Sequence, residues 1–257
     1  MKALKLFWSR GHERNAGDWF SPLICERLSG RAVVYADPRR CDLAAAGSLL
    51  ARLNKSHALH RAGLRRSLHV WGTGSLRQED RLSGLHRLHA LRGRLTLARC
   101  ERVETPPRLG DPGLLAGLLL DGPVEKRHSV GVIPHLADRE HTEVVSFVSR
   151  TAKARLLDLT SPVGDLLAAI ASCERILSSG LHGLVFADAF GIPNRWFTAS
   201  GALTGGRHKF DDYYSAFDLH QEPVRLPGLD LEAAFDGYAR PRIETIKREL
   251  LESFPFR

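Results

Sequence analysis

Short apolar runs alternate with amphipathic stretches along almost the whole chain. Residues 163, 166, 167 and 170 are apolar and repeat at the spacing of one helical face. The apolar runs between such stretches are short and end in glycine, serine or charged residues, as strands do. This alternation predicts an α/β protein with mostly parallel strands. Strands are expected at residues 2–8, 32–35, 43–46, 68–71, 85–91, 130–134, 154–159, 175–178 and 195–198.

Helical patterns separate these strands and extend to the end of the chain. The segment 123–127 is polar and resembles a linker. We therefore expect two Rossmann-like halves, residues 1–124 and residues 125–257. Helices are expected after residue 18 as far as 28, near 92–96, and at 144–148, 162–173, 181–190, 210–217, 231–238 and 243–254.

Residues 175–193 predict a buried strand, a tight turn and a helix. The turn at 178–180 consists of two serines and a glycine, which favour a helix N-cap. Gly191 suits a left-handed residue at the helix end, and Pro193 blocks any continuation. His182 is therefore expected in or just before the first helical turn, at the carboxyl end of a strand. Ligands bind at such positions in open α/β sheets.

The net charge of +8 is concentrated in the first half of the chain. Residues 1–124 carry 21 Lys and Arg against 11 Asp and Glu, whereas residues 125–257 carry 16 against 18. Such asymmetry indicates a face for a polyanion, which could be nucleic acid, an anionic membrane or a phosphorylated substrate. A solvated basic surface without a partner explains the same pattern.

No segment predicts a membrane span or a secreted protein. The longest apolar run, near residues 114–120, is much shorter than the ~20 residues that a spanning helix needs. The N-terminal apolar segment is too short for a signal peptide and reads as a strand. Four cysteines are scattered without a paired spacing, which is typical of free thiols in a reducing compartment. We therefore expect a cytoplasmic protein.

Familiar nucleotide and hydrolase motifs are missing from the sequence. There is no Gly-x-Gly-x-x-Gly, no P-loop and no Gly-x-Ser-x-Gly. Small-residue turns that follow strands could present backbone N–H groups to an anion, although such turns are also ordinary in α/β proteins. They are Asn15–Asp18, Gly47–Ser48, Gly72–Ser75 and Ser178–Gly180.

Two histidine pairs are weak candidates for a metal site. His57 and His60, and His86 and His89, are each three residues apart. No acidic residue or cysteine at a suitable spacing completes a first coordination sphere. We interpret them as surface or packing histidines and expect no metal.

His182 is the strongest candidate for proton transfer. A histidine titrates near neutral pH and can act as a general acid or base, although a structural role explains one buried histidine equally well. The positive end of a helix dipole disfavours the imidazolium. A bound dianionic substrate would offset this effect, so protonation is expected mainly in the substrate complex.

Six motifs in order resemble the polysaccharide pyruvyl transferase family. The similarity spans essentially the whole chain and is greatest to the ketal pyruvate transferase branch that decorates exopolysaccharides such as succinoglycan and xanthan. Two departures are a glycine at position 180, where the family often has Arg or Ser, and the loss of a proline between Arg92 and Thr96. The motifs are Asn15-Ala-Gly-Asp18, His89-Ala-Leu-Arg92-Gly-Arg-Leu-Thr96, Leu109-Gly-Asp111-Pro112, Gly131-Val-Ile-Pro-His135 with Asp138, Ser178-Ser-Gly-Leu-His182-Gly183 and Lys209-Phe-Asp-Asp-Tyr-Tyr214.

The resemblance implies two Rossmann-like domains in a glycosyltransferase-B-like arrangement, with the active site in the cleft. It implies phosphoenolpyruvate as co-substrate, no further cofactor, and a cyclic pyruvate ketal on a sugar as product. The acceptor is usually a lipid-linked oligosaccharide. His182 matches the family's general acid. The basic domain 1–124 would then face the acceptor and the anionic inner surface of the cytoplasmic membrane, with peripheral contact and no span.

Cationic and polar residues near His182 are expected to hold the substrates. We assign Arg92 and Lys209 to the phosphate and carboxylate of the donor because charge-assisted bonds to such groups are strong. The turn serines Ser178 and Ser179 would assist, and His135 is a weaker donor contact. For the acceptor, the expected contacts are Asn15 and Asp18.

Two other functions fit parts of the pattern. A sugar-nucleotide-dependent glycosyltransferase would use the same architecture with a different donor. A nucleic-acid-binding module would use the arginine-rich half, although no recognised binding motif is present and few aromatic residues accompany the arginines. We therefore expect no nucleic-acid partner.

Overall fold

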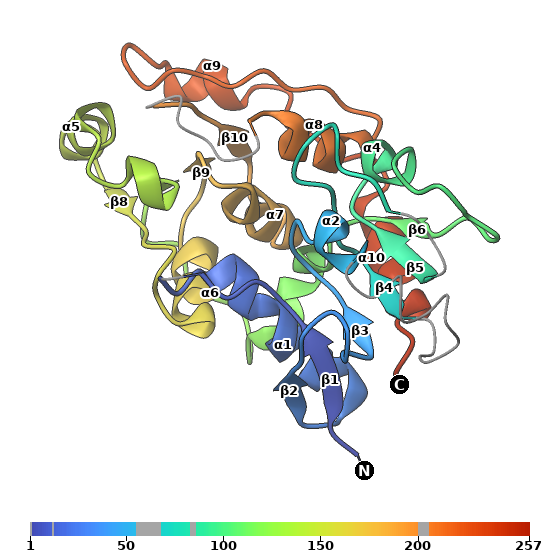
Figure 1. Ribbon diagram of the computed structural model, residues 1–257. Helices are drawn as coiled ribbons and strands as arrows, with labels where there is room; N and C mark the ends of the chain where they lie inside the picture. The colour runs from blue at the N-terminus through green and yellow to red at the C-terminus, as the bar shows by residue number, and fades with distance from the viewer. Residues whose placement is uncertain (1, 12, 55–67, 83–85, 200–205) are drawn as a thin grey trace.

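The computed structural model describes residues 2–11, 13–54, 68–82, 86–199 and 206–257. Its strands form two separate parallel sheets connected by helices (Figure 1). Two histidines considered above, His57 and His60, lie outside the described residues, as does Leu85 at the start of a predicted strand.

The first sheet contains six strands in the order β2-β1-β3-β4-β5-β6, and all neighbouring pairs are parallel. Leu4 and Leu6 are fully buried, as expected for strands covered on their faces by helices. The short β6 is not among the strands expected from the sequence. The strands are β1 (Leu4–Phe7), β2 (Val33–Tyr35), β3 (Leu43–Ala44), β4 (His69–Trp71), β5 (Arg87–Leu91) and β6 (Arg108–Leu109).

The second sheet contains four parallel strands in the order β10-β9-β7-β8. All four residues of β7 are buried, so this strand forms the centre of the second half. Each strand falls within a predicted apolar run or overlaps it. The strands are β7 (Val130–Ile133), β8 (Ala154–Leu156), β9 (Ile176–Ser178) and β10 (Asn194–Trp196).

Capping residues set the start of one helix and the ends of two helices. Asn15 accepts a hydrogen bond from Gly17 N at 2.9 Å, and Gly30 ends the helix with a φ of 62°. Gly191 has a φ of 66° just beyond α7, as predicted. The helices are α1 (Ala16–Ser29), α2 (Leu50–Leu53), α4 (Arg94–Leu97), α5 (Thr142–Arg150), α6 (Val163–Ala171), α7 (Leu181–Ala189), α8 (His208–Ser215), α9 (Leu231–Phe235) and α10 (Ile243–Ser253), with 3-10 helices η2 (Pro112–Leu119) and η3 (Leu136–Asp138).

The longest apolar run of the sequence forms η2, which packs between the two halves. This 3-10 helix contacts α1 and α7, and its first residues are buried. The sequence indicated only that the run cannot span a membrane. No helix in the described ranges is long and apolar enough to cross a membrane.

One apolar core joins both sheets. Leu6 of β1, Trp71 of β4 and Phe186 of α7 belong to the same buried cluster. The C-terminal α10 packs against β5, β6 and η2, and Trp71 Nε1 donates to the Leu250 carbonyl at 3.0 Å. The chain therefore returns to the first sheet at its end (Figure 1). The division into domains 1–124 and 125–257 stays a prediction.

Candidate functional site

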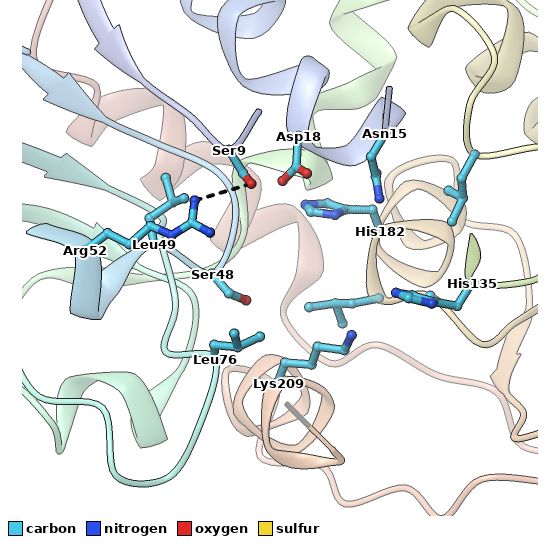
Figure 2. Close-up of a pocket in the computed structure, with 13 residues that line it drawn as sticks. Ser9, Asn15, Asp18, Ser48, Leu49, Arg52, Leu76, His135, His182 and Lys209 are labelled. Carbon is cyan, nitrogen blue, oxygen red and sulfur yellow. Dashed lines mark hydrogen bonds between the residues drawn. The ribbon is translucent and has the colours of Figure 1, made fainter. Parts of the chain in front are cut away.

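A cavity of about 200 Å³ lies where loops from the carboxyl ends of both sheets meet (Figure 2). Such loops are the expected location of a ligand site in parallel α/β sheets. Four of the seven positions predicted to hold substrates line it together with His182, so residues far apart in sequence converge. The lining residues are Ser9, Asn15, Asp18, Ser48, Leu49, Arg52, Leu76, His135, Leu159, Gly180, Leu181, His182 and Lys209.

His182 is the second residue of α7, as the strand–turn–helix pattern predicted. Gly180 is the extended N-cap residue of this helix. The imidazole packs against α1, where a Cβ on Gly17 would overlap His182 Nδ1. Its Nε2 is buried and has no hydrogen-bond partner within the described chain. His182 thus lines the cavity with one ring edge and buries the other.

Burial and charge keep the His182 imidazole neutral. Burial lowers its pKa below the usual value, and the cationic Arg92 and Lys209 act in the same direction. The Asp111 carboxylate opposes these effects. An anion bound beside His182 would raise the pKa, because it favours the imidazolium. The ring is therefore suited to gain its proton together with an anionic substrate.

Lys209 and Asp18 approach the cavity from opposite sides (Figure 2). Burial and the neighbouring Arg92 lower the pKa of Lys209 to about 8. Burial raises the pKa of Asp18 to about 6, although Arg52 and Lys209 act against this rise. Lys209 Nζ forms no hydrogen bond or ion pair with any described residue. Its charge is therefore available to a ligand anion.

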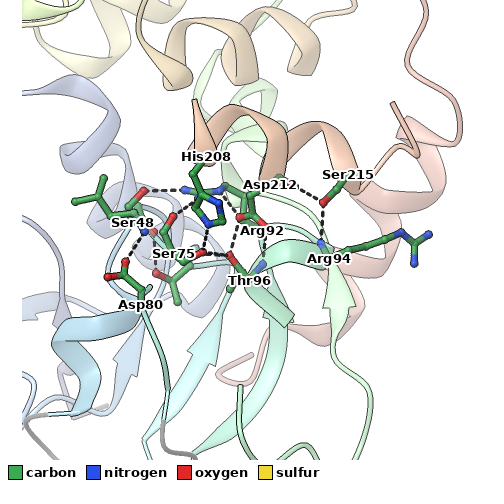
Figure 3. A network of polar contacts seen from close by, with 12 residues as sticks. Ser48, Ser75, Asp80, Arg92, Arg94, Thr96, His208, Asp212 and Ser215 are labelled. Carbon is green, nitrogen blue, oxygen red and sulfur yellow. Dashed lines mark hydrogen bonds and ion pairs between the residues drawn. The ribbon is translucent and has the colours of Figure 1, made fainter. Parts of the chain in front are cut away.

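Arg92 occupies a different place from the one expected. Its side chain is only 1% exposed and lies within a network of polar contacts that includes Asp212 (Figure 3). Its Nε donates to Asp212 of α8 at 2.8 Å, and its Nη1 donates to Ser48 at 2.8 Å. Asp212 also accepts from Thr96 N and Thr96 Oγ1. Arg92 therefore fixes α8, which carries Lys209, and it does not line the cavity, so its assignment as a donor contact stays a prediction.

The two serines of the predicted anion-binding turn, Ser178 and Ser179, also form hydrogen bonds within the protein. Ser178 Oγ donates to the Ile133 carbonyl at 2.9 Å. Ser179 Oγ donates to Asp138 at 2.8 Å and accepts from His135 N at 2.8 Å. Both serines are fully buried. Their hydroxyls hold β9 against the loop after β7 and do not line the cavity, so their assignment to donor binding stays a prediction.

Asn15 and His135 line the cavity, but each also caps a helix. Asn15 Oδ1 caps α1, and His135 Nδ1 accepts from Ala137 N at 3.3 Å to cap η3. Burial is the main cause that lowers the pKa of His135, and Lys209 adds to it. The neutral His135 can offer Nε2 to a ligand while its cap bond persists.

Arg52 is the cationic residue that the sequence interpretation missed. It lies on α2, a single turn that the apolar periodicity did not reveal, and its Nη1 lies 3.5 Å from Ser9 Oγ (Figure 2). The available signal was the Gly47–Ser48 turn, because an arginine four residues after such a turn falls on the first helical turn. Arg52 adds a second positive charge to the cavity.

Nothing in the described part of the chain resembles a metal centre. No group of three or more His, Cys, Asp or Glu side chains in these ranges is arranged to hold an ion. His89 Nε2 lies 2.8 Å from His69 Nδ1 with the rings stacked. Burial and the neighbouring His69 lower the pKa of His89 to about 4. His89 is thus a packing histidine, as interpreted from the sequence.

Gly17→Ala is expected to lower the activity of the site without stabilising the protein. The added methyl would overlap the His182 imidazole and displace it. Gly164 is the matched control, since it is also the second residue of a helix but has open space around it. Gly164→Ala should raise stability by ~0.4–1 kcal/mol and leave turnover unchanged. Urea denaturation and turnover measurements check both variants, and equal behaviour would contradict the contact.

Comparison with known proteins does not assign the chain to a family. No protein-family model matches the sequence. The uncharacterized protein L143 of Acanthamoeba polyphaga mimivirus is 28% identical over 222 residues, which cover 82% of this chain and 74% of the viral protein.

Two solved structures share the general arrangement at low similarity. An alpha-glucosyltransferase in complex with UDP and a 13-mer DNA containing a HMU base has a TM-score of 0.41 and 11% identity, covering 98% of this chain and 95% of that one. The E. coli ADP-heptose lps heptosyltransferase II has a TM-score of 0.33 and 13% identity, covering 98% and 99%. These likenesses are weak and concern the fold alone. The two parallel sheets, with a cavity at their carboxyl ends, confirm the predicted α/β class.

Proposed function

We propose that this protein is a transferase that forms a pyruvate ketal on a sugar, with phosphoenolpyruvate as donor. The observation that carries the proposal is the cavity itself. It combines a neutral, partly buried histidine with two cationic side chains, Lys209 and Arg52, and one carboxylate, Asp18. A small donor with a phosphate and a carboxylate complements this set of charges.

The size of the cavity supports a small donor. Its volume of about 200 Å³ is below the ~300–1,000 Å³ typical of sites for drug-sized ligands. Phosphoenolpyruvate is far smaller than a nucleoside diphosphate sugar. In this proposal Lys209 and Arg52 neutralise the donor anions, so the site needs no metal ion.

The first chemical step is protonation of carbon. The donor dianion raises the pKa of His182, and the imidazolium gives its proton to the methylene carbon of phosphoenolpyruvate. The electron pair of the C=C bond forms the new C–H bond, which leaves an oxocarbenium-like centre at C2. Lys209 remains charged beside the phosphate and stabilises the bound donor.

The sugar then adds twice to C2. One hydroxyl attacks C2 and gives its proton to Asp18, whose raised pKa makes it a better base than an ordinary carboxylate. The C2–O bond to phosphate breaks, and the second hydroxyl closes the ketal as its proton passes to the departing phosphate. Proton return from Asp18 to His182 completes the cycle. The products are the ketal and inorganic phosphate.

Phosphate release from phosphoenolpyruvate in the presence of a lipid-linked or model glycoside tests the function. We expect phosphate and a product heavier than the acceptor by one ketal-linked pyruvate, as seen by mass spectrometry. Incubation without the glycoside is the control and should release little phosphate. Absence of both products with a panel of bacterial repeat-unit glycosides would argue against pyruvyl transfer.

A sugar-nucleotide-dependent glycosyltransferase is the second candidate. A neighbouring cavity of about 450 Å³ shares Asn15 and Asp18 with the first, so a larger donor would find space across both. Thermal-shift measurements with phosphoenolpyruvate and with UDP- and ADP-sugars distinguish the two functions. Stabilisation by a nucleotide sugar alone would favour glycosyl transfer.

The proposal includes peripheral contact with an anionic membrane in the cytoplasm. Its basis is the excess of positive charge in residues 1–124 together with a lipid-linked acceptor. Sedimentation with vesicles should show binding to anionic lipid that weakens with salt. Equal binding to neutral and anionic vesicles at every salt concentration would contradict the proposed contact with an anionic membrane.

The pH dependence of kcat/KM should show an acidic limb from Asp18 and a basic limb to which Lys209 contributes. Below about pH 6 Asp18 gains a proton and loses its function as a base. Above about pH 8 Lys209 loses its charge and the donor binds less well. Lys209→Arg should remove the part of the basic limb that Lys209 contributes, because a guanidinium stays charged in this range, whereas the part due to His182 should remain. A flat profile from pH 8 to 9.5 in the unmodified protein would contradict the role of Lys209.

A further inference from the structure

Asp111 is a fully buried carboxylate outside the cavity lining. It precedes η2, and its Oδ1 caps that helix by accepting from Gly113 N at 2.8 Å. Its Oδ2 is buried and has no hydrogen-bond partner in the described ranges. An unpartnered carboxylate oxygen in the interior is costly and calls for an explanation.

One ring nitrogen of His182 lacks a hydrogen-bond partner in the described chain in the same way. His182 Nε2 is also buried without a partner among the described residues. A neutral imidazole can place its proton on Nε2 and leave Nδ1 unprotonated. Nδ1 lies on the side of Gly17 and α1, whose residues line the cavity. One atom therefore lacks an acceptor and the other lacks a donor.

The packing of η2 on α7 brings Asp111 into the neighbourhood of the first turn of α7. A Cβ on Gly113 would lie 2.7 Å from Val185 Cγ1 and 3.1 Å from Asp111 Oδ1. Val185 is one helical turn after His182 and lies on the same face of α7. The beginning of η2 therefore rests against the beginning of α7.

Charges from several elements act on the imidazole. Arg92 and Lys209 disfavour the imidazolium, Asp111 is the carboxylate that favours it, and Asp18 of α1 lines the same cavity. Asp111 therefore offsets part of the effect of burial and of the two cations.

We propose that Asp111 is the positioning residue of His182, with Oδ2 accepting a hydrogen bond from Nε2–H so that Nδ1 faces the substrate. The contact closes in the substrate complex, in which hydrogen bonds of catalytic groups tighten. Asp111 touches no substrate. The catalytic meaning of the pair rests on the proposed function, whereas the pair itself does not.

Asp111→Asn tests the pair while keeping the helix cap. The asparagine can still accept from Gly113 N but carries no charge. We would titrate ¹⁵N-histidine-labelled protein by NMR with saturating inorganic phosphate as the anion, and assign His182 from the signal lost in His182→Gln. The His182 pKa should fall by ~1 unit or more in Asp111→Asn, with the distal cap His141 unchanged. An identical His182 titration in both proteins would overturn the proposal and leave Asp111 as a helix cap alone.

A second variant guards against loss of folding. Asp111→Ser also retains a cap acceptor, and thermal melting identifies which variant is folded. If phosphoenolpyruvate transfer is observed, the folded variant should lose ~10-fold or more in kcat with the KM for phosphoenolpyruvate nearly unchanged, because Asp111 acts through His182. If the unmodified protein shows no such transfer, the proposed function fails while the titration still decides the pair.

Discussion

Replacing His182 by glutamine is expected to lower kcat for phosphate release from phosphoenolpyruvate by ~10²–10⁴-fold. Glutamine fills a similar volume in the cavity but cannot give a proton to carbon. The donor should still bind, because Lys209 and Arg52 keep their charges. Single-turnover measurements of phosphate release with saturating donor separate this chemical step from binding.

His141 provides the matched control for this substitution. Its side chain caps α5 by accepting from Glu143 N, and it does not line the cavity. Asparagine is a good N-cap residue, so His141→Asn should keep both the fold and the activity. Retention of most of the activity in His182→Gln, with His141→Asn unchanged, would show that His182 is not the general acid.

Arg92→Met is expected to lower the free energy of unfolding by roughly 3–5 kcal/mol. The change leaves the fully buried Asp212 carboxylate without its cationic partner. It also releases α8, so Lys209 should move and the KM for the donor should rise. Urea denaturation gives the first effect and steady-state kinetics gives the second.

The contact between α4 and the segment after α8 offers a control pair at the surface. Arg94 of α4 forms an ion pair with Asp218 at 2.9 Å, and both side chains are more than half exposed. Arg94→Met should cost only ~0–1 kcal/mol, because solvent screens an exposed pair. Equal losses of stability in the two variants would contradict the structural importance of the buried pair.

The sequence revealed the elements that local patterns encode. The strands and the larger helices follow from apolar runs and helical periodicity, and the end of α7 follows from Gly191. The position of His182 in the first turn of α7 was predictable for the same reason. Short elements such as α2 and β6 were not predicted, because a few residues carry too little periodic signal.

Local sequence patterns could not predict which residues would form hydrogen bonds or ion pairs with each polar side chain. Arg92 is basic and follows β5, which fits a donor contact as well as a buried ion pair. Its actual partner, Asp212, is 120 positions further along the chain. Asp111 was missed for the opposite reason, since nothing in its neighbouring residues points to His182, and Arg52 was signalled only by the Gly47–Ser48 turn.

The sequence by itself determined the α/β class, the order of the main elements and the placement of His182 at the end of a strand. These properties depend on residues within a few positions of one another, where propensity, capping and apolar spacing act. Only the tertiary structure decided which charges face the cavity. Lys209 reaches it because the Arg92–Asp212 pair anchors α8, and Ser178 and Ser179 do not because their hydroxyls bind neighbouring loops. Burial and contacts between distant segments decide which side chains reach the cavity, and neither can be read from the local sequence.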